Sequence, residues 1–157
     1  MRPFPASFLP IAGALWLMIL TTAPLALHNE ATALPAVAVY RASSMLCHQR
    51  AERSFRIANI QMPVCGRCFG LYLSGAIGAF GAWALRRRAA PSGLAVRLVL
   101  MAAAAPILIS VGLEWTGFIR GSNISRCLSA LPLGAAVGWL LQQVVTARQE
   151  ESCVIIP

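Results

Sequence analysis

The sequence predicts an all-α membrane protein with four transmembrane helices and a small Cys/His-containing polar cap between the first and second helices. Of 157 residues, 58% are hydrophobic and only 11% are charged, whereas soluble domains carry about 25% charged residues. Four long uncharged runs alternate with polar segments, and a membrane-spanning helix needs about 20 mostly apolar residues. We therefore expect a single membrane domain over residues 1–157, held in the cell membrane as a multi-pass protein.

The apolar runs fix where the helices are expected. They predict helices at about residues 8–27, 65–85, 94–113 and 127–147, with the polar cap at residues 28–64. The first run could instead be a signal peptide. The apolar part of a signal peptide is only about 7–15 residues long, however, so a retained helix is favoured. Small residues recur at four-residue spacing in the second and fourth helices, which favours close packing between them in lipid.

The cap itself has two expected parts. Residues 31–46 are moderately apolar and too mixed to cross a membrane, which favours a helix lying in the interface. Residues 54–62 alternate between apolar and polar side chains, and the alternation slips at Ala58-Asn59. This pattern indicates a small β-hairpin with a tight turn, leading toward the second membrane helix.

Three cysteines and one histidine gather at the cap. Cys47-His48 is followed closely by Cys65-Gly66-Arg67-Cys68. Thiolates and imidazole are the preferred ligands of tetrahedral Zn²⁺, and a C-x-x-C pair is a common zinc-binding turn. The pattern predicts a Cys₃His metal site formed by Cys47, His48, Cys65 and Cys68, with zinc as the metal and iron as the second choice. Since adjacent residues can fail to converge on one ion, a three-ligand site with an open position is a further alternative.

A second interpretation treats Cys65 and Cys68 as the redox pair of a membrane thiol–disulfide oxidoreductase. Their place at the start of a helix, beside Arg67, would favour the thiolate form. Cys47 or Cys127 could then exchange the disulfide, with a quinone as electron acceptor. This interpretation leaves His48 without a role, so the metal site is favoured, and an inert thiol cluster is the third possibility. Whether the protein is an enzyme stays open.

The charge of the chain is carried by arginine alone. All 13 basic residues are Arg and the net charge is +8. A bias toward arginine codons would explain the absence of lysine. In a membrane protein this charge favours contact with the bilayer and with anionic lipid or a small anionic ligand. No nucleic-acid-binding motif is present, and nothing in the sequence indicates an oligomeric state.

A polar pocket is expected beside the cap. Two crossings separate residues 28–64 from the segment that begins at Glu114, so both segments lie on one membrane face. Glu114 ends the third predicted helix, and an ionisable group at the membrane edge is a functional candidate. The alternative interpretation is that Glu114 only forms an interfacial salt bridge with Arg120 or Arg126. The expected pocket residues are Arg50, Arg53, Arg67, Glu114, Asn123 and Arg126.

Membrane orientation is read from the arginines. The three arginines at residues 86–88 follow the second predicted helix directly. Such an anchor favours a cytoplasmic location for that end and for the N-terminus. The cysteine cap is therefore expected on the extracytoplasmic face.

The cysteine block resembles a known family. The sequence is similar to the small prokaryotic membrane proteins of domain of unknown function 2085 over about residues 40 to 140. The resemblance rests on Cys47-His48-Gln49, Arg53-Ser54-Phe55, Pro63-Val64-Cys65-x-Arg67-Cys68-x-Gly70-x-Tyr72, and on Glu114, Asn123, Arg126 and Gly134. This chain departs from the usual pattern with Glu114 in place of Asp-Gly, and with Ser129-Ala130 in place of Thr-Gly. The resemblance implies a membrane fold with a Cys/His site and no particular activity.

Overall fold

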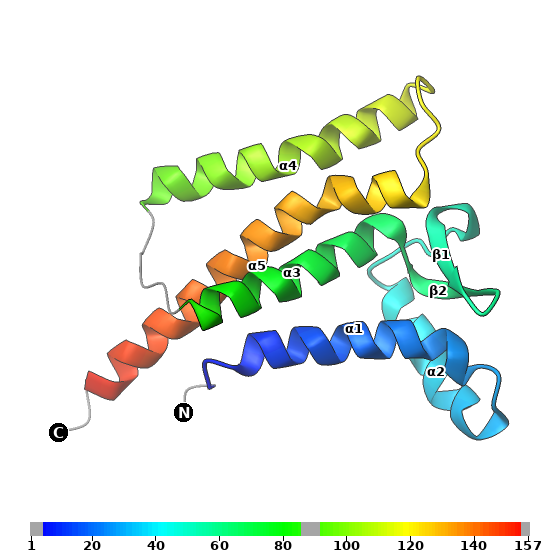
Figure 1. Ribbon diagram of the computed structural model, residues 1–157, viewed down its shortest axis with the longest axis horizontal. Helices are drawn as coiled ribbons and strands as arrows, with labels where there is room; N and C mark the ends of the chain where they lie inside the picture. Colours follow the sequence, from blue (N-terminus) through cyan, green and yellow to red (C-terminus); the bar gives the residue numbers. More distant parts are fainter. Residues whose placement is uncertain (1–4, 86–91, 155–157) are drawn as a thin grey trace.

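The computed structural model describes residues 5–85 and 92–154. Four long helices lie side by side, and a small helix and a hairpin gather at one end of them (Figure 1). In chain order the elements are α1 (Phe8–Ala26), α2 (Glu30–Ser44), the short 3₁₀ helix η1 (Ala51–Arg53), β1 (Ser54–Ile57), β2 (Ile60–Cys65), α3 (Gly66–Ala84), α4 (Gly93–Trp115) and α5 (Asn123–Val154).

Three of these helices are long and apolar enough to cross a membrane: Phe8–Ala26, Gly93–Trp115, and Asn123–Gln149 within α5. The helix predicted at 65–85 is present as α3, but it is not one of the three. Its buried face is made of glycine, alanine and serine, and Arg67 lies in its first turn. These residues lower the mean hydropathy because they serve helix packing rather than contact with lipid. The fourth crossing stays a prediction.

The last helix begins earlier than its uncharged run. The run predicted a helix from residue 127, whereas α5 begins at Asn123 and continues to Val154. Ser122 explains the earlier start, because its side-chain oxygen accepts a hydrogen bond from the backbone N–H of Ser125 at 3.1 Å. Such a cap satisfies a free donor at the helix start. The first turn of α5 therefore carries polar residues that hydropathy alone assigns to a loop.

The cap contains both elements that the sequence indicated. The helix α2 occupies the moderately apolar segment and is capped by Asn29, whose side chain accepts a hydrogen bond from Ala31 N at 3.0 Å. Strands β1 and β2 pair in antiparallel fashion, and Ala58 and Asn59 form the turn with φ values of 48° and 65°. Positive φ at both positions is typical of a type I′ hairpin turn. The fold is thus helical with one added two-stranded sheet.

Helices α3 and α5 make the closest packing in the molecule. A Cβ atom placed on Gly66 would lie 2.8 Å from the backbone oxygen of Asn123, and one on Gly70 or Gly78 would overlap the carbonyl of Cys127 or Ala135. Glycine on α5 has the same role, since a Cβ on Gly138 would overlap the backbone of α3. Small residues at four-residue spacing permit this contact between helix backbones.

The Gly78→Ala substitution tests this contact. We expect it to lower the free energy of unfolding in detergent by about 1–3 kcal/mol, because the added methyl group forces the two backbones apart. Gly112→Ala on α4 is the matched control, since nothing lies within 4 Å of the added Cβ. Thermal unfolding of both variants gives the comparison. Equal stability for the two proteins would contradict the close packing described here.

Candidate metal centre

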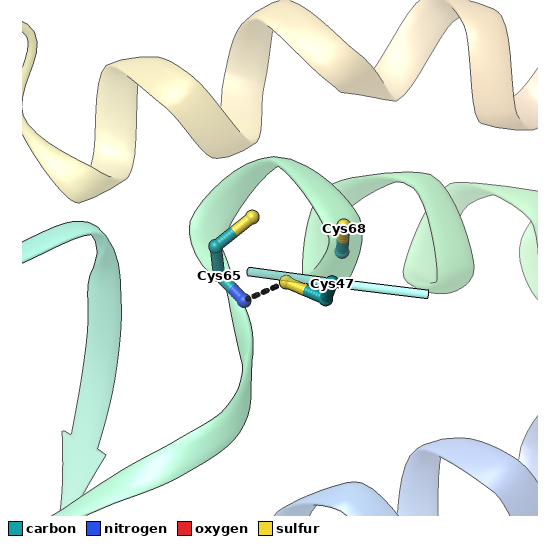
Figure 2. A group of neighbouring side chains, drawn as sticks. All are labelled: Cys47, Cys65 and Cys68. Atoms are coloured by element: carbon teal, nitrogen blue, oxygen red, sulfur yellow. Dashed lines mark hydrogen bonds between the residues drawn. The ribbon is translucent and has the colours of Figure 1, made fainter. Parts of the chain in front are cut away.

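Three cysteine thiols meet where the cap joins α3. Their Sγ atoms all lie within 4.8 Å of one another, and none is in a disulfide. Cys47 follows the end of α2, Cys65 is the last residue of β2, and Cys68 lies in the first turn of α3. Figure 2 shows the three side chains grouped at the start of this helix. The group therefore joins three separate elements of the chain.

Backbone hydrogen bonds hold the thiols in place. The N–H of Cys47 donates to the oxygen of Ser43 at 2.9 Å, which continues the last turn of α2. The N–H of Cys65 donates to the Cys47 sulfur at 3.2 Å, as the dashed line in Figure 2 shows. Cys68 follows Cys65 by three residues at a helix start, so both side chains lie on the same side of the turn. The arrangement matches a C-x-x-C turn whose third sulfur comes from the preceding segment.

Gln49 positions the chain after Cys47, a role that sequence reasoning missed. Its backbone has a φ of 45°, and its side-chain amide donates to the oxygens of Tyr40 at 2.8 Å and Pro63 at 2.7 Å. The Gln61 amide in turn donates to the backbone oxygen of Gln49, and the Tyr40 hydroxyl donates to the oxygen of Gln61. The only sequence signal was a polar amide directly after Cys-His.

The thiol group lies against an apolar core. Cys47 is 5% exposed and packs with Leu20 of α1 and Val64 of β2. The aromatic rings of Trp16 and Tyr72 pack against the same core, with ring centroids 6.1 Å apart and ring planes nearly perpendicular. Low polarity around a thiolate strengthens its attraction to a nearby cation.

The surroundings of Cys65 favour the thiolate form of its side chain. A hydrogen bond from the Cys68 thiol is the main reason that the pKa of Cys65 falls to about 5, and the backbone N–H of Cys68 and the Cys47 thiol lower it further. Partial burial acts in the opposite direction. Because metal ions bind thiolates rather than thiols, Cys65 is the member of the group that is ready to bind a metal at neutral pH.

His48 is not part of the group within the residues that the structure describes. Its side chain is exposed, whereas that of the neighbouring Cys47 is buried. Neither residue lies in a helix or a strand, and His48 is not among the residues whose ligand atoms meet in the thiol group. Cys127 on α5 is a free thiol outside the group as well. The structure thus brings together three of the four predicted ligands.

An ion-pair network lies beside the cap. The Glu114 carboxylate accepts hydrogen bonds from Arg67 Nη2 at 2.8 Å and from Arg126 Nε at 3.1 Å to each oxygen. The side chains are largely buried, with 9% of Glu114, 15% of Arg67 and 10% of Arg126 exposed. Arg67 also donates to Ser110 Oγ at 3.2 Å. One carboxylate therefore joins α3, α4 and α5.

The same network is tied to the cap. The Asn123 amide donates to the backbone oxygen of Ser54 at 2.9 Å, and Arg126 Nη1 donates to that of Glu52 at 3.3 Å. Arg126 Nη1 also donates to Asn123 Oδ1 at 3.2 Å. Residues at the start of α5 thus hold the chain segment that enters the hairpin.

The remaining pocket candidates lie apart from this network. Arg50 is exposed and lies 4.0 Å from Glu52. Arg53 is partly exposed, and no side-chain partner for it is found among the described residues. The pocket predicted from sequence therefore includes four residues that meet in the structure, namely Arg67, Glu114, Asn123 and Arg126. Gly121 adds to it, because a side chain there would overlap the Glu114 carboxylate.

Comparisons with known proteins place these residues in a family. One relative is an uncharacterised protein of Methanocaldococcus jannaschii, 43% identical over 42 residues, and this chain spans only 27% of that relative's length. Another is an uncharacterised protein of Methanothermobacter thermautotrophicus, 31% identical over 101 residues that cover 60% of this chain and 83% of the relative. No solved structure matches the chain.

The family model with the description "predicted membrane protein (DUF2085)" matches residues 47–140. These residues begin at the first thiol of the group and include the second and third thiols and the Glu114 network. They also include most of the packed surface between α3 and α5. The matched segment is more than half of the chain, and on this basis the protein belongs to the DUF2085 family of predicted membrane proteins.

Proposed function

We propose that Cys47, Cys65 and Cys68 hold one zinc ion in a membrane protein whose metal centre lies at the membrane surface. The observation that carries the proposal is the convergence of three free thiols within 4.8 Å of one another. Zn–S bonds of about 2.3 Å place tetrahedral sulfurs roughly 3.8 Å apart. The thiols can therefore reach this geometry with small rotations of their side chains. Iron is the second choice for the same ligands.

The fourth ligand position of the proposed site has two versions. The sequence favours His48, which would close the coordination shell and make the site structural. The exposed position of His48 favours a shell of three thiolates with one position left for a water molecule or an outside ligand. Open positions of this kind are typical of catalytic zinc sites. Both versions of the site are proposed, because the substitution His48→Ala distinguishes between them.

The charges near the cap support a metal–thiolate group. Arg67, Arg126 and Glu114 together carry one net positive charge in a largely buried place. Three thiolates and a divalent ion carry one net negative charge, so the two groups complement each other. Arg67 is part of the C-x-x-C turn and links them. The same positive charge would also favour an anionic lipid head group or a small anionic ligand at this face.

The oxidoreductase alternative has less support. A disulfide between Cys65 and Cys68 would need a partner thiol and an electron acceptor, and Cys127 lies outside the thiol group of the described residues. The alternative is kept as an outcome of the metal experiment below.

We also propose four membrane crossings within a single domain over residues 1–157, with the cap outside. The small residues of α3 would let this helix cross between α1 and α5, and its first turn lies beside the first turn of α5 (Figure 1). Four crossings bring the cap and the start of α5 to one face, which is consistent with the hydrogen bonds between them. The arginines at 86–88 would then anchor the cytoplasmic side.

Metal content provides the first test of the proposed function. Protein purified gently and without chelators should contain about one zinc per chain by elemental analysis. Cys68→Ser should lose the metal and unfold at lower temperature, whereas Cys127→Ser should keep it, because that thiol lies outside the group. His48→Ala should keep the metal in the open version of the site and lose it in the closed version.

Two outcomes would contradict the metal proposal. Wild-type protein that is free of metal and as stable as the metal-treated sample would remove the basis for the site. Alkylation in cells that traps Cys65 and Cys68 in both oxidised and reduced forms, with faster exchange when quinone is added, would favour the oxidoreductase instead.

The Glu114→Gln substitution tests the ion-pair network. It removes the only carboxylate that Arg67 and Arg126 share and leaves two guanidinium groups close together. We expect the free energy of unfolding to fall by about 3–5 kcal/mol, as for other buried pairs that lose one partner. Glu52→Gln is the matched control, because that carboxylate is exposed and its nearest arginine is 4.0 Å away. Similar denaturation curves for both variants would show that the network is not important for stability.

Single introduced cysteines test the orientation. In intact cells, a maleimide that cannot cross membranes should label Arg120→Cys, in the segment between α4 and α5, and should label Gly93→Cys only after permeabilisation. Both positions are exposed, which makes them a matched pair. The reverse pattern would place the cap in the cytoplasm, and labelling of both in intact cells would contradict a crossing by α4.

A further inference from the structure

A cavity of about 550 Å³ lies between α1, α3 and α5. Small residues from all three helices create it, among them Ala12, Gly75 and Gly138, with leucine side chains around them. Cavities of roughly 300–1,000 Å³ are the usual size of small-molecule sites. The volume is therefore large enough for an organic ligand rather than a single water molecule.

The polarity of the cavity is uneven along its length. Among the described residues that line the cavity, only Trp16 and Tyr72 have side chains with a hydrogen-bonding group, and both lie at the end nearest the cap. The described part of the chain provides neither side chain with a hydrogen-bond partner. The other end, near Leu9 and Leu141, has only apolar side chains. The walls thus fit a ligand with a long apolar part and a polar group at one end.

That polar end adjoins the thiol group. Tyr72 follows Cys68 by four residues and so lies on the same face of α3. Trp16 and Tyr72 also pack against the core that contains Cys47. The two aromatic rings therefore form the wall between the cavity and the cysteines.

Water does not suit this cavity. Water needs two to four polar partners, and most of the lining offers none. The cavity is also open to its surroundings, so its apolar walls contact the medium that surrounds the helices. Helices α1 and α5, which form two of the walls, are long and apolar enough to lie in a membrane. The medium around them is then hydrocarbon chains, which match the apolar lining.

We propose that the cavity binds one hydrocarbon chain of a membrane lipid, with the polar end of that lipid at Trp16 and Tyr72, next to the thiol group. The proposal does not depend on the metal. It assigns a lipid as the ligand of this protein and places the polar group of the lipid at the aromatic wall that separates the cavity from the cysteines. Outside the lining at the opposite end, the side-chain amide of Gln142 donates to the oxygen of Ala6 at 2.7 Å and joins α5 to the start of α1.

The experiment uses the full-length protein in nanodiscs that contain phosphatidylglycerol with a photoreactive diazirine on one acyl chain. After illumination, peptide mapping should find the lipid attached to the cavity-lining residues of α3 and α5. Ala12→Phe should lower this attachment roughly tenfold, because the ring occupies the chain's volume. Val137→Phe fills the cavity from α5 and should have the same effect. Ala14→Phe is the matched control, since Ala14 is exposed on the same helix and does not line the cavity.

The results of the lipid-attachment experiment can be distinguished from those of the metal experiment. Thermal unfolding and metal content identify any variant that fails to fold, and both cavity-filling variants are expected to keep the metal content of the wild type. Equal attachment in wild type, Ala12→Phe and Val137→Phe would overturn the proposal. So would attachment confined to outward-facing residues such as Ile77, which is 61% exposed, since that pattern describes ordinary bilayer contact.

Discussion

The backbone contact between α3 and α5 determines the arrangement of the functional residues. At Gly66 and Gly70 the two helices approach so closely that no side chain fits between them. This contact places the first turn of α3, with its C-x-x-C cysteines, directly beside the first turn of α5, with Asn123 and Arg126. A wider separation would break the hydrogen bond from Asn123 to Ser54, which holds the entry to the hairpin. The glycines thus act on the thiol group through the helix ends that they align.

Helix α4 depends on electrostatics more than on packing. None of its apolar residues is buried, so its apolar surface is free to face lipid. In lipid the hydrophobic effect does not hold one helix against another. Glu114 provides the attachment instead, because its carboxylate binds arginines on α3 and α5. The carboxylate also keeps two nearby guanidinium groups from repelling each other, so the helix and the pocket stabilise one another.

The sequence predicted the parts of this arrangement that depend on composition and spacing. Apolar runs located the long helices, and alternation located the hairpin turn at Ala58-Asn59, where positive φ values were found. It could not predict the place of His48, because the direction of a side chain in an irregular segment depends on the backbone angles of its neighbours. Gln49 has such an angle, and its hydrogen bonds to Tyr40 and Pro63 became evident only in the folded chain.

The position of the thiol group between a polar and an apolar region is its most informative property. Toward the polar region lie Arg67 and Arg126, whose charge would complement the proposed metal–thiolate group. Toward the apolar region lie Trp16 and Tyr72, which form the end of the apolar cavity. A polar group at that end of the cavity would lie within a short distance of the cysteines while its chain stayed in hydrocarbon. A soluble protein would need a binding cleft to hold an apolar chain with its polar group near the cysteines. Here the packing of α1, α3 and α5 provides the space for such a chain. The proposed metal centre and the proposed lipid site, although tested separately, therefore share one boundary, and the residues of that boundary are where an activity should be sought first.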